Sequence, residues 1–448
     1  MPPPQLPTGF AFGAATAALQ VEGALAEDGR GPSIWESFAA RPLVIADAST
    51  PETGAGSYHR TTEDIALLRE LGVDSYRFSL SWPRLLPQGR GRVNQAGFDH
   101  YDRLIDDLLE AGIDPMVTLY HFDLPQALED DGGWRNRSTV EAMAEYAALA
   151  GEKYADRVKH WVPISEPNVI AMLGYGIGEH APGRKLFFDV LPVTHHLLLA
   201  HGRAAIELRN AGATSVGCAN NHAPMWPASD DEADVGATKL FDALWNGMFL
   251  EPILLGRYPA DLAPLLDDVV EPGDMATIRQ PLDFYGVNYY SPIRVAAGDE
   301  GSDMPFRFVP LLGRTRTASG WSVVPTALRE WLVLFRARFR AALPPIVITE
   351  SGSSWVEEVD ADGIVHDKER SEYLEAHLEA VAEAVHRGVD VQAYYAWSLL
   401  DSWEWAHGLT TPYGLVHVDR TTLTRTPKDS FRTYQRLIRE LRAPASAE

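Results

Sequence analysis

Cysteine is almost absent from this chain of 448 residues, in which Cys218 is the only one. No internal disulfide can form, so the fold does not depend on an oxidising compartment. The sequence also lacks an apolar run long enough to cross a bilayer. Its first residues, MPPPQLPTGF, have neither the basic segment nor the apolar core of a secretory signal. We therefore expect a cytoplasmic protein that does not bind a membrane.

Positive charge is scarce. The chain has 39 basic against 62 acidic residues and a formal net charge of −23. Such a charge repels nucleic acid and anionic membranes, and it favours solubility and neutral or cationic partners. Because 46% of the residues are hydrophobic and 23% are charged, the composition is that of a soluble globular protein with a large core. Nucleic-acid binding is therefore not expected.

Internal repeats, low-complexity blocks and long Gly/Ser linkers are also missing. Length alone would suggest about three domains, but α/β barrels of this size form one unit. We predict a single domain over residues 1–448.

Short β-like runs recur along the chain, separated by longer helical or irregular segments. These runs are FAFGAA near 10, DSYRFSLSW at 74, PMVTLYH at 115, HWVPIS at 160, SVGCANNH at 215, DFYGVNYY at 283, IVITE at 346 and VQAYYAWSL at 391. Helical patterning lies between them, as in TEDIALLRELG, where Thr62 is a candidate N-cap and Gly72 a stop. Eight strands alternating with helices favour a parallel (β/α)8 TIM barrel, and the alternative is an open doubly wound sheet.

A barrel of this kind carries its chemistry at the C-terminal ends of the strands. Polar and aromatic side chains are frequent there: Gln20, Arg77, His121, Glu166, Asn288, Tyr290, Glu350 and Trp397. A single glutamate at a strand end is usually a solvated loop residue. Two carboxyl groups at one barrel mouth, however, are what glycosidic cleavage requires, because one protonates the leaving oxygen and the other meets the charge that develops at the anomeric carbon. Glu166 and Glu350 are the candidates.

Metal chemistry is the less favoured reading. His195, His196 and His201 form THHLLLAHG, but they do not repeat a ligand spacing with a partner carboxylate. We predict no metal site and no cofactor.

Seven motifs in order carry a family resemblance along essentially the whole chain. They are FAFGAATAALQVEGA, YRFSLSWPRLLP, TLYHFDLPQAL, ISEPN, YGVNYY, VITESG and AWSLLDSWEWAHG. In this set the chain closely resembles glycoside hydrolase family 1, the β-glucosidases and their relatives. The resemblance implies a retaining β-glycosidase with Glu166 as acid/base and Glu350 as nucleophile, the carboxyl groups lying about 5 to 5.5 Å apart.

The same resemblance implies the sugar pocket. Gln20 and Glu404 match residues that bind the 3- and 4-hydroxyls, Glu404 also reaching the 6-hydroxyl, and His121 matches a 3-hydroxyl contact. Trp397 matches a platform under the ring, and Trp405 a second aromatic wall. Trp321 resembles a tryptophan that holds the aglycone. Arg77 and Tyr290 are plausible partners of Glu350, and Asn288 is a supporting residue.

Two serines depart from the family pattern. Ser165 stands before the acid/base and Ser351 after the nucleophile, where relatives usually have asparagine. The family asparagine donates to the sugar 2-hydroxyl, a contact that strengthens in the transition state. Three hypotheses follow: a β-glucosidase with a modest handicap, a glycosidase for sugars altered at C2, or a transglycosidase. A carbohydrate-binding pseudoenzyme is the alternative from another class.

The substrate is expected to be a small β-glycoside or oligosaccharide without a phosphate. Phospho-glycosidases of the family carry a serine and a lysine near the last motif, whereas this chain has Glu404, which would repel phosphate. Glucosides are favoured, and β-galactosides and β-fucosides are possible further substrates.

Overall fold

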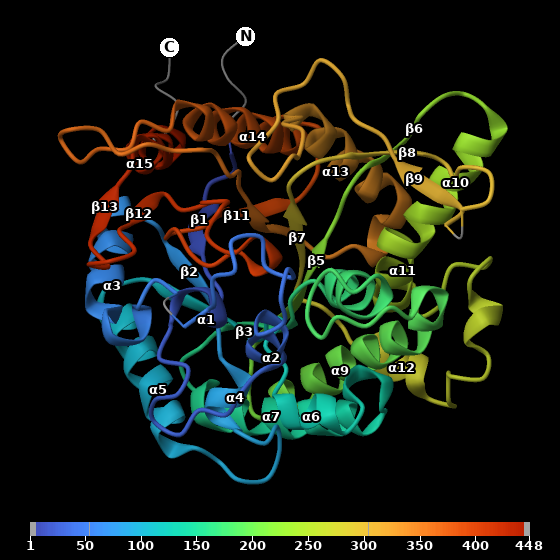
Figure 1. Ribbon diagram of the computed structural model, residues 1–448, viewed down its shortest axis with the longest axis horizontal. Coiled ribbons are helices and arrows are strands. Elements are labelled where there is room, and N and C mark those ends of the chain that lie inside the picture. The colour runs from blue at the N-terminus through green and yellow to red at the C-terminus, as the bar shows by residue number, and fades with distance from the viewer. Residues whose placement is uncertain (1–5, 53, 303, 443–448) are drawn as a thin grey trace.

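Eight parallel strands form a closed barrel at the centre of the computed structural model, which describes residues 6–52, 54–302 and 304–442 (Figure 1). The order around the barrel is β1-β11-β10-β7-β5-β4-β3-β2. The strands are β1 Ala11–Ala15, β2 Ser75–Ser79, β3 Asp114–Tyr120, β4 His160–Ile164, β5 Ser215–Asn221, β7 Phe284–Tyr289, β10 Ile346–Ser351 and β11 Val391–Trp397. Each coincides with one of the predicted runs. The (β/α)8 prediction is confirmed, and the open sheet is wrong.

Helices surround the barrel (Figure 1). The longer ones are α2 Ile34–Ala39, α3 Thr61–Leu71, α5 Gln95–Glu110, α7 Ser138–Tyr154, α9 Leu191–Asn210, α10 Glu232–Asp242, α11 Met248–Leu255, α13 Pro325–Phe339, α14 Lys368–His386 and α15 Asp429–Arg442. Short helices are α1 Ala18–Val21, α4 Trp82–Leu85, α6 Gln126–Asp130, α8 Pro167–Val169 and α12 Asp274–Ile278. Gly72 ends α3 with φ of 80°, as predicted. The predicted cap at Thr62 is wrong, because α3 already begins at Thr61 and has no side-chain cap.

The strand register brings the C-terminal ends of several strands to one end of the barrel. Glu350 on β10 pairs with Asn288 on β7, and Asn288 pairs with Asn221 on β5. Ser165, directly after β4, bridges to Ala219 on β5. Residues that lie far apart in the sequence therefore meet at one barrel mouth.

Two small sheets were not expected from the sequence. One contains β6 Met225–Pro227, β8 Ile293–Ala297 and β9 Phe306–Phe308, and the other pairs β12 Val416–Val418 with β13 Arg425–Pro427. Four of these five strands have only three residues, too few for an alternating pattern to be recognised. Figure 1 shows β6, β8 and β9 beside α10, at the periphery of the barrel.

Within the described ranges, no helix is long and apolar enough to span a bilayer.

Candidate active site

A cavity of about 580 Å³ opens where the carboxyl ends of the strands meet, and both candidate carboxyl groups line it. Eight of the twelve predicted site residues line it: His121, Glu166, Tyr290, Trp321, Glu350, Trp397, Glu404 and Trp405. The other four, Gln20, Arg77, Ser165 and Asn288, are buried. The fold therefore gathers the predicted set around one cavity, with some members behind its wall.

Glu166 follows β4 in a left-handed backbone conformation, with φ of 48° and ψ of 58°. This region is unusual for a residue with a side chain, and the next residue, Pro167, begins helix α8. Such backbone strain persists only where the surroundings enforce it, and it is concentrated at functional sites. The rigid turn fixes where the Glu166 carboxyl group points.

Two amide groups hold the Glu166 carboxyl group. Asn288 Nδ2 donates to Oε1 at 2.8 Å, and Asn221 Nδ2 donates to the same oxygen at 3.0 Å. Burial, followed by the nearby charge of Glu350, raises the pKa of Glu166 to about 8, although both amides act in the opposite direction. Because Oε1 already accepts two N–H groups, the proton of the neutral acid lies on Oε2.

Glu350 lies at the end of β10 between a cation and a phenol. Arg77 Nη1 pairs with Glu350 Oε1, and Tyr290 Oη donates to Oε2 at 2.7 Å. Burial and the charge of Glu350 raise the pKa of Tyr290 well above its ordinary value, so the phenol keeps its proton. Thr349 Oγ1 donates to Asn288 Oδ1 at 2.6 Å, so Asn288 bridges the chain beside Glu350 to Glu166. Arg77 and Tyr290 are thus both in contact with Glu350.

The chain beyond Glu350 passes very close to the end of β11. A Cβ atom added at Gly352 would lie 1.8 Å from the carbonyl oxygen of Trp397, so only glycine fits there. Ser351 Oγ lies 3.2 Å from Tyr373 Oη, and Ser351 is buried and does not line the cavity. The second departure from the family pattern therefore lies in the packing behind the site.

Ser165 is completely buried, and its hydroxyl group accepts a hydrogen bond of 2.9 Å from Arg77 Nη2. Since Arg77 pairs with Glu350 through its other terminal nitrogen, one guanidinium group joins Ser165 to Glu350. This places Ser165 beside the nucleophile candidate, and its contact with a sugar stays a prediction.

Aromatic rings and a neutral imidazole form one part of the wall. The His121 ring centroid lies 5.7 Å from that of Trp397 and 5.8 Å from that of Trp405. Burial and the charge of Arg77 hold the pKa of His121 well below its ordinary value, so its ring is neutral. Within the described structure, His121 Nδ1 is buried without a hydrogen-bond partner. His121 itself lines the cavity, so its neutral ring is placed to meet a ligand.

Glu404 and Gln20 lie in the same part of the fold. Ser402 Oγ donates to Glu404 Oε1 at 2.9 Å, and burial raises the pKa of Glu404 to about 8. Gln20 Nε2 donates to the carbonyl oxygen of Trp403 at 3.0 Å, while its Oε1 has no partner among the described residues. Glu404 lines the cavity, whereas Gln20 is buried behind it.

Trp321 differs from the other tryptophans of the site because 40% of its surface is exposed. Its ring centroid lies 5.0 Å from that of Tyr290. Trp321 therefore stands at the outer part of the cavity, next to a residue that touches Glu350.

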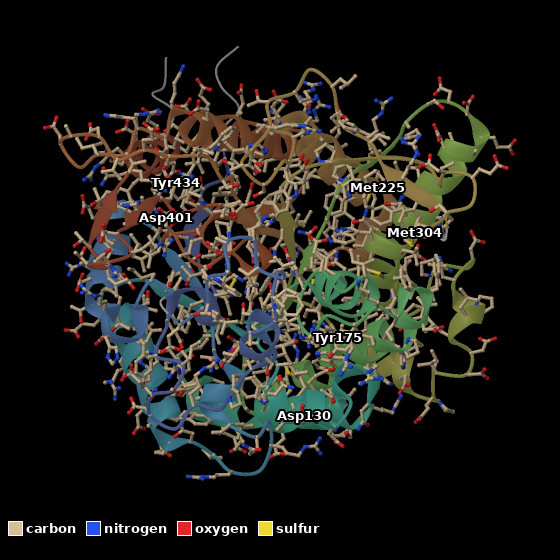
Figure 2. The ribbon with its side chains drawn as sticks, viewed as in Figure 1. Asp130, Tyr175, Met225, Met304, Asp401 and Tyr434 are labelled. Atoms are coloured by element: carbon tan, nitrogen blue, oxygen red, sulfur yellow. The ribbon has the colours of Figure 1, made fainter. Side chains whose placement is uncertain are left out.

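A buried ion cluster supports the loop that carries Glu404. Lys428 Nζ donates to Asp401 Oδ1 at 2.8 Å and pairs with Glu357. Asp401, labelled in Figure 2, also accepts a hydrogen bond of 2.9 Å from the backbone N–H of Gly414. Burial acts to raise the pKa of Asp401, but the charge of Lys428 and its other partners hold it below its ordinary value. The loop is thus fixed by charges that lie behind the cavity.

The three histidines set aside in the sequence are all buried. His195 does have a carboxylate neighbour, Asp274, at 2.8 Å, but Arg137 pairs with that carboxylate and Tyr258 occupies the other ring nitrogen. In the described parts of the chain, no group of three potential metal ligands occurs.

Two features of the site were not predicted from the sequence. Asn221, the last residue of β5, lines the cavity and binds Glu166. Its place at a strand end within SVGCANNH was the available signal, since the same criterion selected the other candidates. The second feature is a broad apolar extension of the cavity, formed by segments around residues 169–191, 241–245 and 304–311. No motif marks these segments.

Comparison with known proteins agrees with this geometry. The model of glycosyl hydrolase family 1 matches residues 3–442. The chain is 40% identical to β-glucosidase A of Acetivibrio thermocellus, covering 97% of this chain and 98% of that one. It is 39% identical to a bifunctional β-D-glucosidase/β-D-fucosidase of Bifidobacterium breve, with coverages of 96% and 98%. The crystal structure of the psychrophilic β-glucosidase of Micrococcus antarcticus superposes with a TM-score of 0.94 at 43% identity, covering 98% of each chain. The chain belongs to glycosyl hydrolase family 1.

Proposed function

We propose that this protein is a retaining β-glucosidase that hydrolyses unphosphorylated β-D-glucosides. The observation that carries the proposal is the contrast between two carboxyl groups in one cavity. Glu166, with a pKa of about 8, holds a proton at neutral pH, whereas Glu350 accepts from Arg77 and Tyr290 as a carboxylate does. One acid and one anion beside the same substrate are the requirement of the double-displacement mechanism.

In the first step, a Glu350 carboxylate oxygen attacks the anomeric carbon of the bound glucoside. The bond from that carbon to the aglycone oxygen breaks, and Glu166 Oε2 gives its proton to the departing oxygen, which leaves as an alcohol. The products are a covalent glucosyl ester on Glu350 and an ionised Glu166. Once Glu350 is esterified its negative charge is gone, so one cause of the raised pKa of Glu166 is removed.

In the second step, the ionised Glu166 takes a proton from water, and the water oxygen attacks the anomeric carbon. The ester bond breaks, Glu350 is released as a carboxylate, and glucose leaves with its original β configuration. Both carboxyl groups thereby return to their starting states.

The sugar would bind through the polar and aromatic groups gathered around the cavity. Gln20, His121 and Glu404 are proposed to bind hydroxyl groups. His121 and Glu404 line the cavity, and Gln20 lies buried behind it. Trp397 and Trp405 would cover the apolar face of the ring, and Trp321 the aglycone. β-Galactosides and β-fucosides are proposed as further substrates, and the Bifidobacterium breve relative is named for β-glucosidase and β-fucosidase activity.

We further propose that the chain works in the cytoplasm as one catalytic domain. Cys218 is buried and free, so the fold needs no oxidising compartment. The single continuous family match is consistent with one domain.

Product stereochemistry and covalent trapping test this proposal. Release of glucose from 4-nitrophenyl β-D-glucoside, followed by NMR from the first seconds, should give the β anomer before mutarotation. A 2-fluoro-glucoside inactivator should add one sugar mass to the peptide containing Glu350, and Glu350→Gln should prevent the labelling. Initial release of the α anomer would show an inverting enzyme and would overturn the mechanism.

A further inference from the structure

Outside the catalytic region, the cavity is lined mostly by apolar side chains from two parts of the chain. The first group comes from residues 169–191 and consists of Val169, Met172, Leu173, Ile177, Phe187, Phe188, Val190 and Leu191. The second group comes from α10, the turn after it and the segment around β9, and includes Phe241, Leu244, Trp245, Met304, Phe306, Phe308, Val309 and Leu311. Both groups are continuous with the wall that holds the carboxyl groups, so they border the space that a leaving group enters.

In the described part of the chain, every exposed phenylalanine and tryptophan side chain lines this cavity. Among the described residues, four large aromatic side chains are exposed, namely Phe187, Phe188, Phe308 and Trp321, and all four line it. The fractions are 51% for Phe187, 42% for Phe188 and 58% for Phe308. A soluble protein exposes scattered apolar residues without consequence, but a contiguous patch at a cavity marks a binding surface.

The second group is built as a cluster. The Phe241 ring lies 4.8 Å from that of Phe306 and 4.9 Å from that of Phe308, and Phe306 and Phe308 are 6.0 Å apart. Phe241 and Phe306 are buried, so they fix the ring of Phe308 while leaving its surface open. Met304, labelled in Figure 2, belongs to the same region beside α10. In Figure 2, Met304 lies on one side of the molecule, and Asp401, from the ion cluster behind the Glu404 loop, lies on the opposite side.

The first group includes a strained aromatic residue. Phe187 has φ of 49°, a left-handed conformation that a side chain disfavours, and it is nevertheless half exposed. Neither burial nor backbone preference explains its position, and residues with such strain are concentrated at functional sites.

Several polar groups that line this part of the cavity already have hydrogen-bond partners within the protein, although Glu179 and Arg316 also line it. The hydroxyl of Ser319 is already bonded at 2.7 Å to Ser354 and to Tyr413, and Arg294 donates to the carbonyl oxygen of Ala228. A sugar ring placed against the two apolar groups of side chains would lose hydrogen bonds to water that these side chains cannot replace, which is unfavourable.

From these observations we infer that the enzyme takes β-glucosides of bulky apolar aglycones, in preference to glucosides in which the leaving group is another sugar. The inference rests on the proposed function, since it describes the leaving-group part of the same site. The aglycone would contact Phe187 and Phe188 on one segment and Phe308 on the other, with its oxygen near Glu166.

Binding of uncleavable thioglucosides tests this inference independently of turnover. Methyl, butyl and heptyl 1-thio-β-D-glucosides would be titrated calorimetrically below their micelle concentrations, alongside 4-thiocellobiose. Complete burial of one methylene is worth about fourfold in affinity, so a partly buried chain should gain at least about tenfold from methyl to heptyl. Heptyl thioglucoside should also bind at least about tenfold more tightly than 4-thiocellobiose.

Single-residue variants test which side chains produce the gain in affinity with chain length. Phe308→Ala and Phe188→Ala should each reduce the methyl-to-heptyl gain by about threefold or more while leaving the affinity for the methyl compound nearly unchanged. Leu334→Ala is the matched control, because Leu334 is 68% exposed on α13 and does not line the cavity. An affinity that does not rise with chain length, a preference for 4-thiocellobiose, or a gain unaffected by both phenylalanine variants would each overturn the inference. Loss of the proposed function would appear separately, as absence of turnover of 4-nitrophenyl β-D-glucoside.

Discussion

Asn288 Nδ2 donates a hydrogen bond of 2.8 Å to Oε1 of Glu166, while Oδ1 of the same amide accepts a hydrogen bond from Thr349, the residue before Glu350. One amide thus connects the proposed acid with the strand that carries the proposed nucleophile. Asn221 adds a second donor to the same Glu166 oxygen. These bonds leave the other oxygen, Oε2, to carry the proton, and they fix its direction.

Removal of the Asn221 amide group should shift the pH dependence of kcat/KM. Donation from Asn221 favours the ionised form of Glu166, so Asn221→Ala should raise the pKa of Glu166 further. The basic limb of kcat/KM for 4-nitrophenyl β-D-glucoside should then lie at higher pH than in the wild type. Asn220→Ala is the control, because Asn220 bonds Tyr285 and is absent from the cavity wall. A basic limb that stays in place in Asn221→Ala would contradict the assigned role of this amide.

Proton donation by Glu166 should matter most for substrates with poor leaving groups. Glu166→Gln cannot donate a proton, so kcat/KM for an alkyl β-D-glucoside should fall by about 10²- to 10⁴-fold. The first step with 2,4-dinitrophenyl β-D-glucoside, whose leaving group needs no proton, should change far less, as seen in the pre-steady-state burst. In the wild type, activity on the alkyl glucoside should decline as the pH rises through about 8, since Glu166 then ionises. Equal losses on both substrates would show that Glu166 is not the acid.

Ser165 can act either by orienting Arg77 or by direct contact with the sugar 2-hydroxyl, and kinetic measurements distinguish these two roles. If its hydroxyl acts by orienting Arg77, then Ser165→Ala should lower kcat/KM by a similar factor, about threefold to tenfold, for a glucoside and its 2-deoxy analogue. We expect this outcome, because Ser165 is fully buried and already bonded to Arg77. A loss confined to the glucoside would indicate direct contact with the 2-hydroxyl. Ser165→Asn, which restores the residue usual in the family, measures whether serine is a handicap.

The barrel was predictable because each of its strands carries an apolar run long enough to be recognised, from Ala11–Ala15 to Val391–Trp397. The positions of Glu166 and Glu350 were also predictable, since both follow such runs. Their mutual arrangement was not, because the register that places Glu350 beside Asn288 and Asn288 beside Asn221 depends on pairing across the closed sheet. The contribution of Asn221 therefore became visible only in the structure.

The apolar extension of the cavity was hidden for a different reason. Phe187, Phe241 and Phe308 lie on separate segments without a shared period, and an isolated phenylalanine in a sequence predicts core packing at least as well as a ligand contact. Their exposure and their common cavity, which distinguish the two readings, are properties of the folded chain.

The ion cluster behind the Glu404 loop should make a measurable contribution to stability. Lys428 is fully buried between Asp401 and Glu357, so Lys428→Met would leave the buried Asp401 without its lysine partner, while Glu357 would keep only Arg370. Removing one partner of a buried ion pair costs about 3–5 kcal/mol of unfolding free energy. Guanidinium unfolding should show this loss, whereas Lys368→Met, at an exposed pair with Glu372, should show little change. Similar midpoints for the two variants would contradict the structural role of Lys428.

The raised pKa of Glu166 also predicts how stability depends on pH. Its folded value of about 8 lies above the ordinary value of 4.5, so between these limits the folded state holds a proton that the unfolded state has lost. Stability should consequently fall as the pH rises through this window, because the unfolded state binds fewer protons. Glu166→Gln cannot ionise, so its unfolding free energy does not fall for this reason. Between pH 4.5 and pH 9, the difference in unfolding free energy between Glu166→Gln and the wild type should therefore shift in favour of the variant by up to about 4 kcal/mol. Guanidinium unfolding at both pH values measures this, with the exposed Glu63→Gln as control. A difference between Glu166→Gln and the wild type that does not change with pH would mean that Glu166 ionises in the folded protein as readily as in the unfolded chain, and its assignment as the proton donor would lose its physical basis.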